Sequence, residues 1–164
     1  LQAQAQQTGQ ETTAEVSDVI QIGKVVGDEK PEDEYANPSA VENNVITHLN
    51  ASVRLASGSD AINLSKASYT LSSGGNASVV NGDASSNDGI ALYPVQGFEK
   101  SNVSIVSDQS DLMVVRFNLS AIQGISPIEE SKKVVLIANA PAGGTTYTQL
   151  QAPRRIKQYK SYIL

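Results

Sequence analysis

A clean alternation of apolar and polar residues runs through positions 45–55. One set consists of Val45, Thr47, Leu49, Ala51, Val53 and Leu55, and the other of Ile46, His48, Asn50, Ser52 and Arg54. In an extended strand successive side chains point to opposite faces, so a period of two puts each set on its own face. The pattern predicts a half-buried strand with the first set facing a core.

Shorter runs of apolar and β-branched residues follow at close intervals. They lie at 67–71, 90–93, 103–106, 112–119, 134–138 and 145–150, and an earlier run lies at 20–27. Clusters of Gly, Ser, Asn, Asp and Pro separate them, and the pairs Gly74-Gly75 and Gly143-Gly144 are typical of hairpin turns or loops. Residues 156–163 alternate weakly, which predicts an edge strand or an extended tail. About eight short strands predict an all-β fold, an antiparallel β-sandwich or barrel.

Residues 1–17 have a different character. They are rich in Gln, and their apolar side chains form no stripe wide enough to bind a core. Gly9 and several Thr residues would make a helix here marginal on its own, and no capping residue precedes Leu1. We predict that 1–17 is the C-terminal end of a stalk helix held by residues upstream of it, and that 18–164 form a β-sandwich head.

The junction between these two parts resembles a known family. The stretch QQTGQETTAEV at 6–16, followed by the apolar residues of 20–27, is similar to the helix-to-head junction of archaellins, the filament proteins of the archaeal flagellum. Looser similarity continues through 62–66, 111–121 and 140–164. The resemblance implies an immunoglobulin-like head on the outer surface of an extracellular filament, with no enzymatic activity. It also implies a helical homo-oligomer built by an apolar helix upstream of Leu1, and therefore a monomeric isolated head.

Composition narrows the partners. The chain has 164 residues, a length that suits one domain, and a net charge of −5. An acidic chain lacks the clustered Lys and Arg on which nonspecific binding of nucleic acid depends. Zero Cys excludes a disulfide scaffold and Cys-ligated zinc. No apolar run approaches the roughly 20 residues needed to span a bilayer. We therefore expect neither a nucleic-acid partner nor a membrane in the mature filament.

Sequons for N-glycosylation are more frequent than chance would give. The acceptor residues are Asn50, Asn63, Asn76, Asn102 and Asn118, each followed two positions later by Ser. Asn50 lies on the polar face of its predicted strand and Asn76 follows a glycine turn, so a glycan on either is expected to project into solvent. Asn63 and Asn118 have apolar neighbours. The alternative is that all five are polar surface residues.

Oxygen-rich loops are the candidates for a metal site. Asp83, Asn87 and Asp88 gather in one loop, and Ca²⁺ prefers six to eight oxygen ligands. Asp108 and Asp111, on either side of Gln109-Ser110, form a second candidate of equal standing. The alternative is a solvated turn in each case, since a bidentate Glu is missing from the first loop. The single histidine, His48, is expected on the outward face of its strand, where it has no nucleophile-elbow motif to serve.

Charge is distributed unevenly along the chain. Acidic residues gather early, at Asp28, Glu29, Glu32, Asp33 and Glu34. Cationic residues gather late, at Lys132, Lys133, Arg154, Arg155, Lys157 and Lys160. In a helical filament one patch can meet a different patch on the neighbouring subunit. We predict such a contact between subunits, and the alternative is ordinary solvated loops or an intramolecular pair.

A binding module and an enzyme would each require a different set of residues. A cell-surface binding or adhesion module would use exposed aromatic residues as anchors, and the candidates are Tyr69, Tyr93, Phe98 and Tyr147. An enzyme would need a convergent acid–base or nucleophile set, and the sequence offers none. The filament subunit is the leading hypothesis.

Overall fold

The computed structural model describes residues 18–29, 44–86, 89–99 and 103–164, and these form two facing β-sheets with a short third one. The larger sheet has the order β11 (Ser161–Ile163), β1 (Ile20–Asp28), β2 (His48–Leu55), β8 (Leu112–Asn118) and β6 (Ile90–Gln96). The second has the order β10 (Thr145–Gln151), β9 (Lys133–Asn139), β4 (Ser68–Ser73) and β5 (Asn76–Asn81). Strands β3 (Ile62–Asn63) and β7 (Ile105–Val106) pair beside them.

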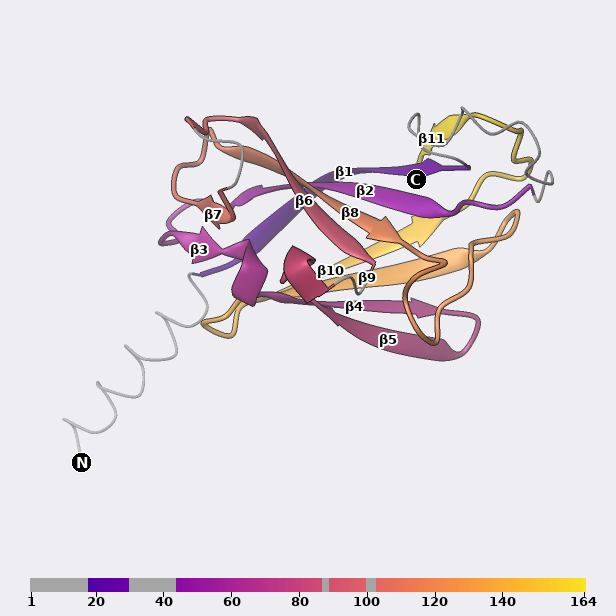
Figure 1. Cartoon of the computed structure of the whole chain (residues 1–164), viewed down its shortest axis with the longest axis horizontal. Coiled ribbons are helices and arrows are strands. Elements are labelled where there is room, and N and C mark those ends of the chain that lie inside the picture. The colour runs from indigo at the N-terminus through magenta and orange to yellow at the C-terminus, as the bar shows by residue number, and fades with distance from the viewer. Residues whose placement is uncertain (1–17, 30–43, 87–88, 100–102) are drawn as a thin grey trace.

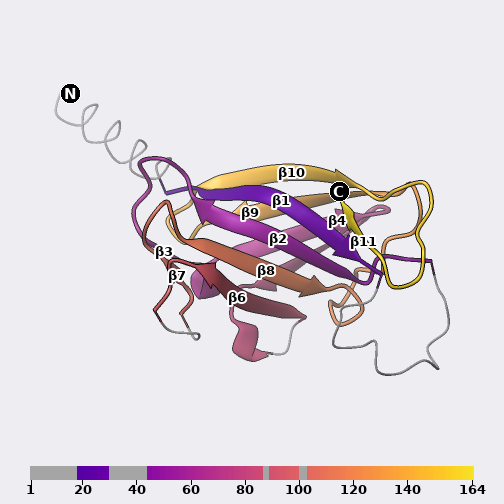
Figure 2. The same ribbon diagram turned by 90° about the horizontal axis from the view of Figure 1, so that it is seen from above.

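Every strand pairing in the described residues is antiparallel. The two larger sheets lie as separate layers (Figures 1 and 2). The prediction of an all-β antiparallel sandwich is therefore confirmed. The immunoglobulin-like detail stays a prediction, as does the stalk helix at 1–17, which lies outside the described residues. No described helix is long or apolar enough to cross a membrane.

The core lies between the two sheets and follows the period of two. Strand β8 alternates strictly, with Met113, Val115 and Phe117 buried and the residues between them half-buried. The facing strand β4 buries Tyr69 and Leu71 in the same way. The rings of Tyr69 and Phe117 meet edge to face, with centroids 5.4 Å apart at 70°. This contact joins the two layers, because one ring comes from each sheet.

The strand predicted at 45–55 is correct in its second half and wrong in its first. Leu49, Ala51, Val53 and Leu55 are buried, but the strand begins only at His48. Ile46 was assigned to the polar face, yet it is fully buried because it forms an isolated bridge with Ile128. Thr47 is half-buried. The side-chain alternation thus changes phase between Ile46 and Leu49.

Strand β5 was not predicted from the sequence, although its turn was. Gly74 and Gly75, with φ of +60° and +88°, form the β4–β5 hairpin turn, a conformation that glycine adopts without strain. Only Val80 of the strand is buried, so no alternation marks it. The tail prediction is confirmed, since β11 pairs with β1 at the edge of the larger sheet.

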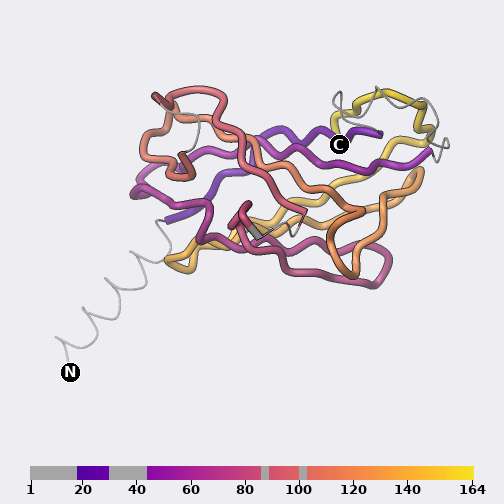
Figure 3. The backbone as a smooth tube through the Cα atoms, in the orientation of Figure 1, coloured from indigo at the N-terminus to yellow at the C-terminus, as the bar shows by residue number. Residues whose placement is uncertain are grey.

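The chain enters the head beside the β9–β10 turn. A Cβ added at Gly144 would lie 2.1 Å from the carbonyl oxygen of Asp18, so only glycine permits this approach. Thr146 Oγ1 donates a hydrogen bond of 2.5 Å to the carbonyl of Ile20. The path is visible in Figure 3, where the beginning of the indigo segment lies close to the orange turn that precedes β10. The N-terminal side of the head is therefore fixed at this end of the sandwich.

Tyr69 is the residue whose replacement we expect to stabilise the head. Its ring is 1% exposed, and its hydroxyl has no hydrogen-bond partner within the described part of the chain. A buried polar group without a partner costs about 1–3 kcal/mol, so Tyr69→Phe is expected to raise the free energy of unfolding by about 1 kcal/mol. Urea denaturation measures the change. A loss of stability in Tyr69→Phe would show that the hydroxyl is satisfied.

The same residue predicts a difference at alkaline pH. Burial raises the pKa of Tyr69 well above its ordinary value. Above pH of about 10 the unfolded chain loses this proton while the folded chain keeps it, so stability falls as pH rises. The wild type is expected to lose up to about 1.4 kcal/mol per pH unit more than Tyr69→Phe there. All other groups are common to the two proteins, so their contributions cancel in the comparison.

Candidate assembly and modification surfaces

Asn76 is the sequon asparagine best placed for modification. It is the first residue of β5, directly after the Gly74-Gly75 turn, and it is exposed. Strand β5 is an edge of its sheet, so this end of the strand faces solvent. The position agrees with the expectation that a glycan on Asn76 projects away from the head.

Asn50 is placed differently from what the sequence suggested. It is half-buried, its Nδ2 donates to Asp28 Oδ2 (2.5 Å), and its Oδ1 accepts from Arg116 Nε (2.9 Å). The Arg116 guanidinium in turn lies 5.1 Å from the Tyr93 ring centroid. These four side chains cross four strands of the larger sheet. The expectation that Asn50 projects freely is therefore wrong, because both ends of its amide are engaged in this network.

Asn63 and Asn118 also use their amide oxygens inside the head. Asn63 Oδ1 accepts from the Ser65 backbone N–H (3.1 Å), Ser65 Oγ (2.7 Å) and Ser104 Oγ (2.9 Å), and so caps the 3₁₀ turn η2 (Leu64–Lys66). Asn118 Oδ1 accepts from the Ser120 backbone N–H at 3.1 Å. Both are half-buried. Asn102 lies outside the described residues.

The two described residues of the predicted acidic patch are buried. Asp28 and Glu29 are only 8% and 2% exposed. Glu29 Oε2 accepts the backbone N–H of Tyr159 at 2.9 Å, and the Glu29 N–H donates to the Lys160 carbonyl at 3.1 Å. Glu29 therefore fastens the C-terminal tail to the end of β1, and the Asp28 carboxylate accepts from Asn50, so both are used inside the head instead of facing a neighbour, which corrects the prediction for them. Glu32, Asp33 and Glu34 lie outside the described residues.

The cationic residues are on the surface, as the sequence suggested. Lys132, Lys133, Arg154, Arg155, Lys157 and Lys160 are all exposed. The tail that carries the last four is held by Glu29, by the Ile156 N–H donating to Glu130 Oε1 (2.8 Å), and by the Lys157 N–H donating to the Tyr162 hydroxyl (2.8 Å). The charges thus stand on a fixed segment.

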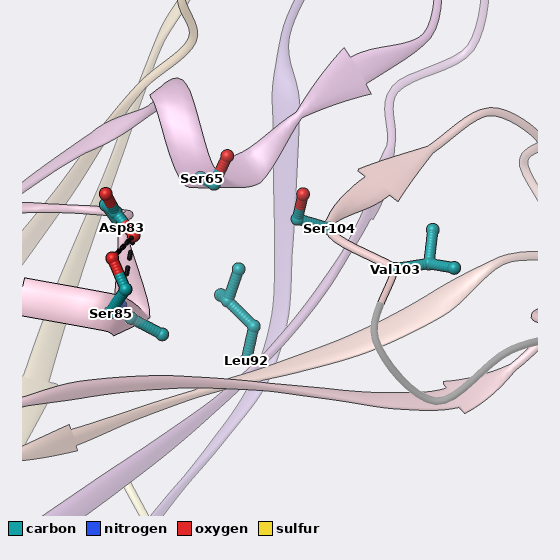
Figure 4. A pocket seen from close by; sticks show the side chains of 7 residues that line it. Ser65, Asp83, Ser85, Leu92, Val103 and Ser104 are labelled. Carbon is teal, nitrogen blue, oxygen red and sulfur yellow. Dashed lines mark hydrogen bonds between the residues drawn. The ribbon is translucent and has the colours of Figure 1, made fainter.

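The loop that begins at Asp83 lines a shallow cavity. Asp83 Oδ1 accepts from the Ser85 hydroxyl (2.6 Å) and the Ser85 backbone N–H (3.0 Å), at the start of the 3₁₀ turn η3 (Ala84–Ser86). These bonds lower the pKa of Asp83. The cavity measures about 440 Å³, and Figure 4 shows Ser65, Leu92, Val103 and Ser104 around it. Asp83 is its only carboxylate, because the described lining otherwise consists of Ser, Ala, Leu and Val.

No metal centre is assembled by the described residues. They contain no group of three or more His, Cys, Asp and Glu side chains that could hold an ion. Asn87 and Asp88 lie outside them, so calcium binding by the first loop stays a prediction. In the second candidate Asp111 is 4% exposed, and its Oδ2 already accepts three hydrogen bonds from donors of its own turn. Asp108 is bonded to Ser110, which lowers its pKa.

His48 and two of the four candidate aromatic anchors are withdrawn from the surface. His48 is 6% exposed and not on an open face, with its Nδ1 2.9 Å from Thr47 Oγ1. Tyr69 is buried and Phe98 packs against the core, so neither is an anchor for a ligand. Tyr93 and Tyr147 are 45% and 62% exposed. Only these two of the four aromatic candidates remain on the surface.

These observations define a structural module: a β-sandwich whose buried polar groups hold its own loops and tail. A family model described as archaeal-type flagellin matches residues 1–152, so the chain belongs to the archaeal-type flagellin family. It is therefore a structural subunit of the archaeal flagellar filament, an extracellular appendage formed by self-assembly. The resemblance seen at the helix-to-head junction is confirmed.

Individual relatives agree with this. Flagellin B1 of Natrialba magadii is 28% identical over 160 residues, covering 93% of this chain and 74% of its own length. Flagellin B1 of Halobacterium salinarum is 25% identical over 165 residues, and the match covers 100% of this chain and 78% of that protein. The crystal structure of archaeal flagellin FlaB1 from Methanocaldococcus jannaschii has a TM-score of 0.68 at 17% identity, covering 88% of this chain and 94% of that one. The structure of the archaeal flagellum of Methanospirillum hungatei strain JF1 has a TM-score of 0.59 at 10% sequence identity, and the match covers 95% of this chain and 81% of that one.

Proposed function

We propose that residues 18–164 form the outer head of the filament subunit and that an apolar helix on the N-terminal side of Asp18 drives assembly. The match to the archaeal-type flagellin family over 1–152 carries this proposal. The head supports it because most of its described apolar side chains lie in one core between its own sheets. Its contribution to assembly is then lateral contact and display.

The oligomeric state of the isolated head tests whether the proposed helix, and not the head, drives assembly. A fragment of residues 18–164 is expected to sediment as a monomer, because the proposed helix would supply most of the buried apolar area in the filament. The full subunit is expected to form filaments visible by electron microscopy. Filaments of the isolated head would contradict the proposal.

We propose that Asn76 carries an N-linked glycan and that Asn50 does not. Asn76 is exposed at a hairpin turn, whereas the amide of Asn50 is bonded to Asp28 and Arg116. Mass spectrometry of peptides from native filaments is expected to find Asn76 modified and Asn50 bare. Asn76→Gln should remove the added mass, and Ser78→Ala, which destroys the same sequon, should do so too. A bare Asn76 in native protein would end this proposal.

We propose that the cationic tail, which carries Arg154, Arg155, Lys157 and Lys160, contacts the acidic residues Glu32, Asp33 and Glu34 of a neighbouring subunit. Its support is the exposure of Arg154 and Arg155 on a fixed segment. The double charge reversal Arg154→Glu/Arg155→Glu is expected to reduce filament yield several-fold and to leave the head's melting temperature unchanged. Wild-type assembly is expected to weaken in the same way at high salt, because the Debye length falls from about 10 Å at 0.1 M to about 3 Å at 1 M and exposed charges farther apart than this length are largely screened. Lys66→Glu, an exposed reversal on η2, is the control.

A further inference from the structure

The outer face of the four-stranded sheet carries an apolar row that runs across all of its strands. Tyr147 of β10 pairs with Ile137 of β9, Ile137 with Thr70 of β4, and Thr70 with Val79 of β5. Paired residues of antiparallel strands share a face, and strands lie about 4.8 Å apart, so the row is about 14 Å long. Its two ends are open, since Tyr147 is 62% and Val79 66% exposed.

The rows on either side of it contain no charge. One consists of Thr145, Asn139, Ser68 and Asn81, and the other of Gln149, Val135, Ser72 and Ala77. We call these three rows the neutral face. Among the described residues of these rows there is no Asp, Glu, Lys or Arg. The next row on the same outer face holds Lys133, paired with Gln151, so the neutral face ends there. On the outer face of the other sheet, Asp28, Arg54 and Arg116 are spread over three strands.

The neutral face also lacks every sequon asparagine. Its rows contain none of the five sequon residues Asn50, Asn63, Asn76, Asn102 and Asn118. Its own Asn81 and Asn139 are not part of a sequon, because neither has Ser or Thr two positions later. No residue of the neutral face is therefore an acceptor for an N-linked glycan. An apolar centre bordered by uncharged Ser, Thr, Asn and Gln is the composition of a protein interface, where charge is depleted.

We propose that the neutral face packs against the head of a second copy of this chain in the filament. The inference rests on the proposed function, because a filament places further copies beside every head. Copies with a net charge of −5 repel one another, and a face without charge is where that repulsion costs least. The contact is heterologous, since repeated head-to-tail contacts build an open filament and isologous ones close into a pair.

Lysine substitutions in the full subunit, including the proposed apolar helix, test this contact. Val79→Lys/Tyr147→Lys places charge on two exposed positions, so the head is expected to keep its melting temperature while filament yield falls at least about tenfold, equivalent to 1.4 kcal/mol. The matched control is Ile105→Lys, at a residue 45% exposed on β7 and away from this sheet. Its yield should stay within about twofold of wild type.

Photo-cross-linking gives a second readout that does not depend on stability. Because the chain has no Cys, the variant Tyr147→Cys offers one site for a maleimide–benzophenone label. In filaments the label is expected to join two copies of the chain, whereas the same label at Ile105→Cys should not. Normal yield of the double lysine variant, or cross-linking at Ile105→Cys alone, would overturn the inference and leave the proposed function standing. Failure of the wild-type full subunit, which includes the proposed apolar helix, to form filaments would instead overturn the proposed function.

Discussion

Replacing Phe117 by alanine is expected to destabilise the head by about 3–5 kcal/mol. Phe117 is fully buried, and its ring is the half of the edge-to-face contact that the larger sheet contributes. Truncation removes both the buried apolar area and the aromatic pair with Tyr69, and a packed interior does not collapse fully into the gap. Domains are stable by about 5–15 kcal/mol, so this single change removes a large share.

Chemical denaturation of the head measures the effect, and Tyr147→Ala is its matched control. Tyr147 is an aromatic residue of the same sandwich, but it is 62% exposed on the outer face. Its truncation is expected to change the stability of the isolated head by less than about 0.5 kcal/mol, as is usual for surface positions. Equal losses from the two variants would show that Phe117 does not join the sheets as described.

The parts of the fold that follow from local patterns were predictable. Strands β2 and β8 alternate because one face of each is buried against the other sheet, and this appears directly in the sequence. Strand β5 gave no such signal, since Val79 and Val80 are adjacent and point to opposite faces. The neutral face could not be seen without β5, because it exists only once four strands are in register.

The placement of charged residues depended on contacts distant in the chain. The carboxylate of Glu29 accepts a hydrogen bond from the backbone N–H of Tyr159, which is 130 positions away. An acidic run that looks like a solvated loop in the sequence therefore begins with a buried residue. Asn50 was misjudged for a similar reason, since Arg116 reaches it from another strand. The Asp111 turn, in contrast, is local. Its Ser-Asp-Gln-Ser-Asp pattern is a signal that an Asp side chain will cap nearby backbone N–H groups.

Asp111→Ala is expected to cost about 3 kcal/mol, because hydrogen bonds to a buried charged group contribute about 1.5–3 kcal/mol each and add incompletely. Asp111 Oδ2 accepts the backbone N–H groups of Ser107 and Asp108, both at 2.9 Å, and the Ser107 hydroxyl at 3.3 Å. Alanine would leave the two N–H groups without an acceptor. Gly97 packs against this carboxylate so closely that an added Cβ would lie 2.1 Å from Oδ1, so the turn also fixes the end of β6.

Two comparisons separate this structural role from metal binding. Asp108→Ala removes an exposed carboxylate of the same turn, bonded only to Ser110 among the contacts described, and should have a much smaller effect on the denaturation midpoint. Asp111→Asn keeps an acceptor oxygen and should recover part of the loss. If Asp111 instead stabilised the head by holding calcium, a chelator would lower the melting temperature of the wild type as far as Asp111→Ala does. We expect the chelator to leave this turn unaffected, because the oxygen that would bind the ion already accepts three protein donors.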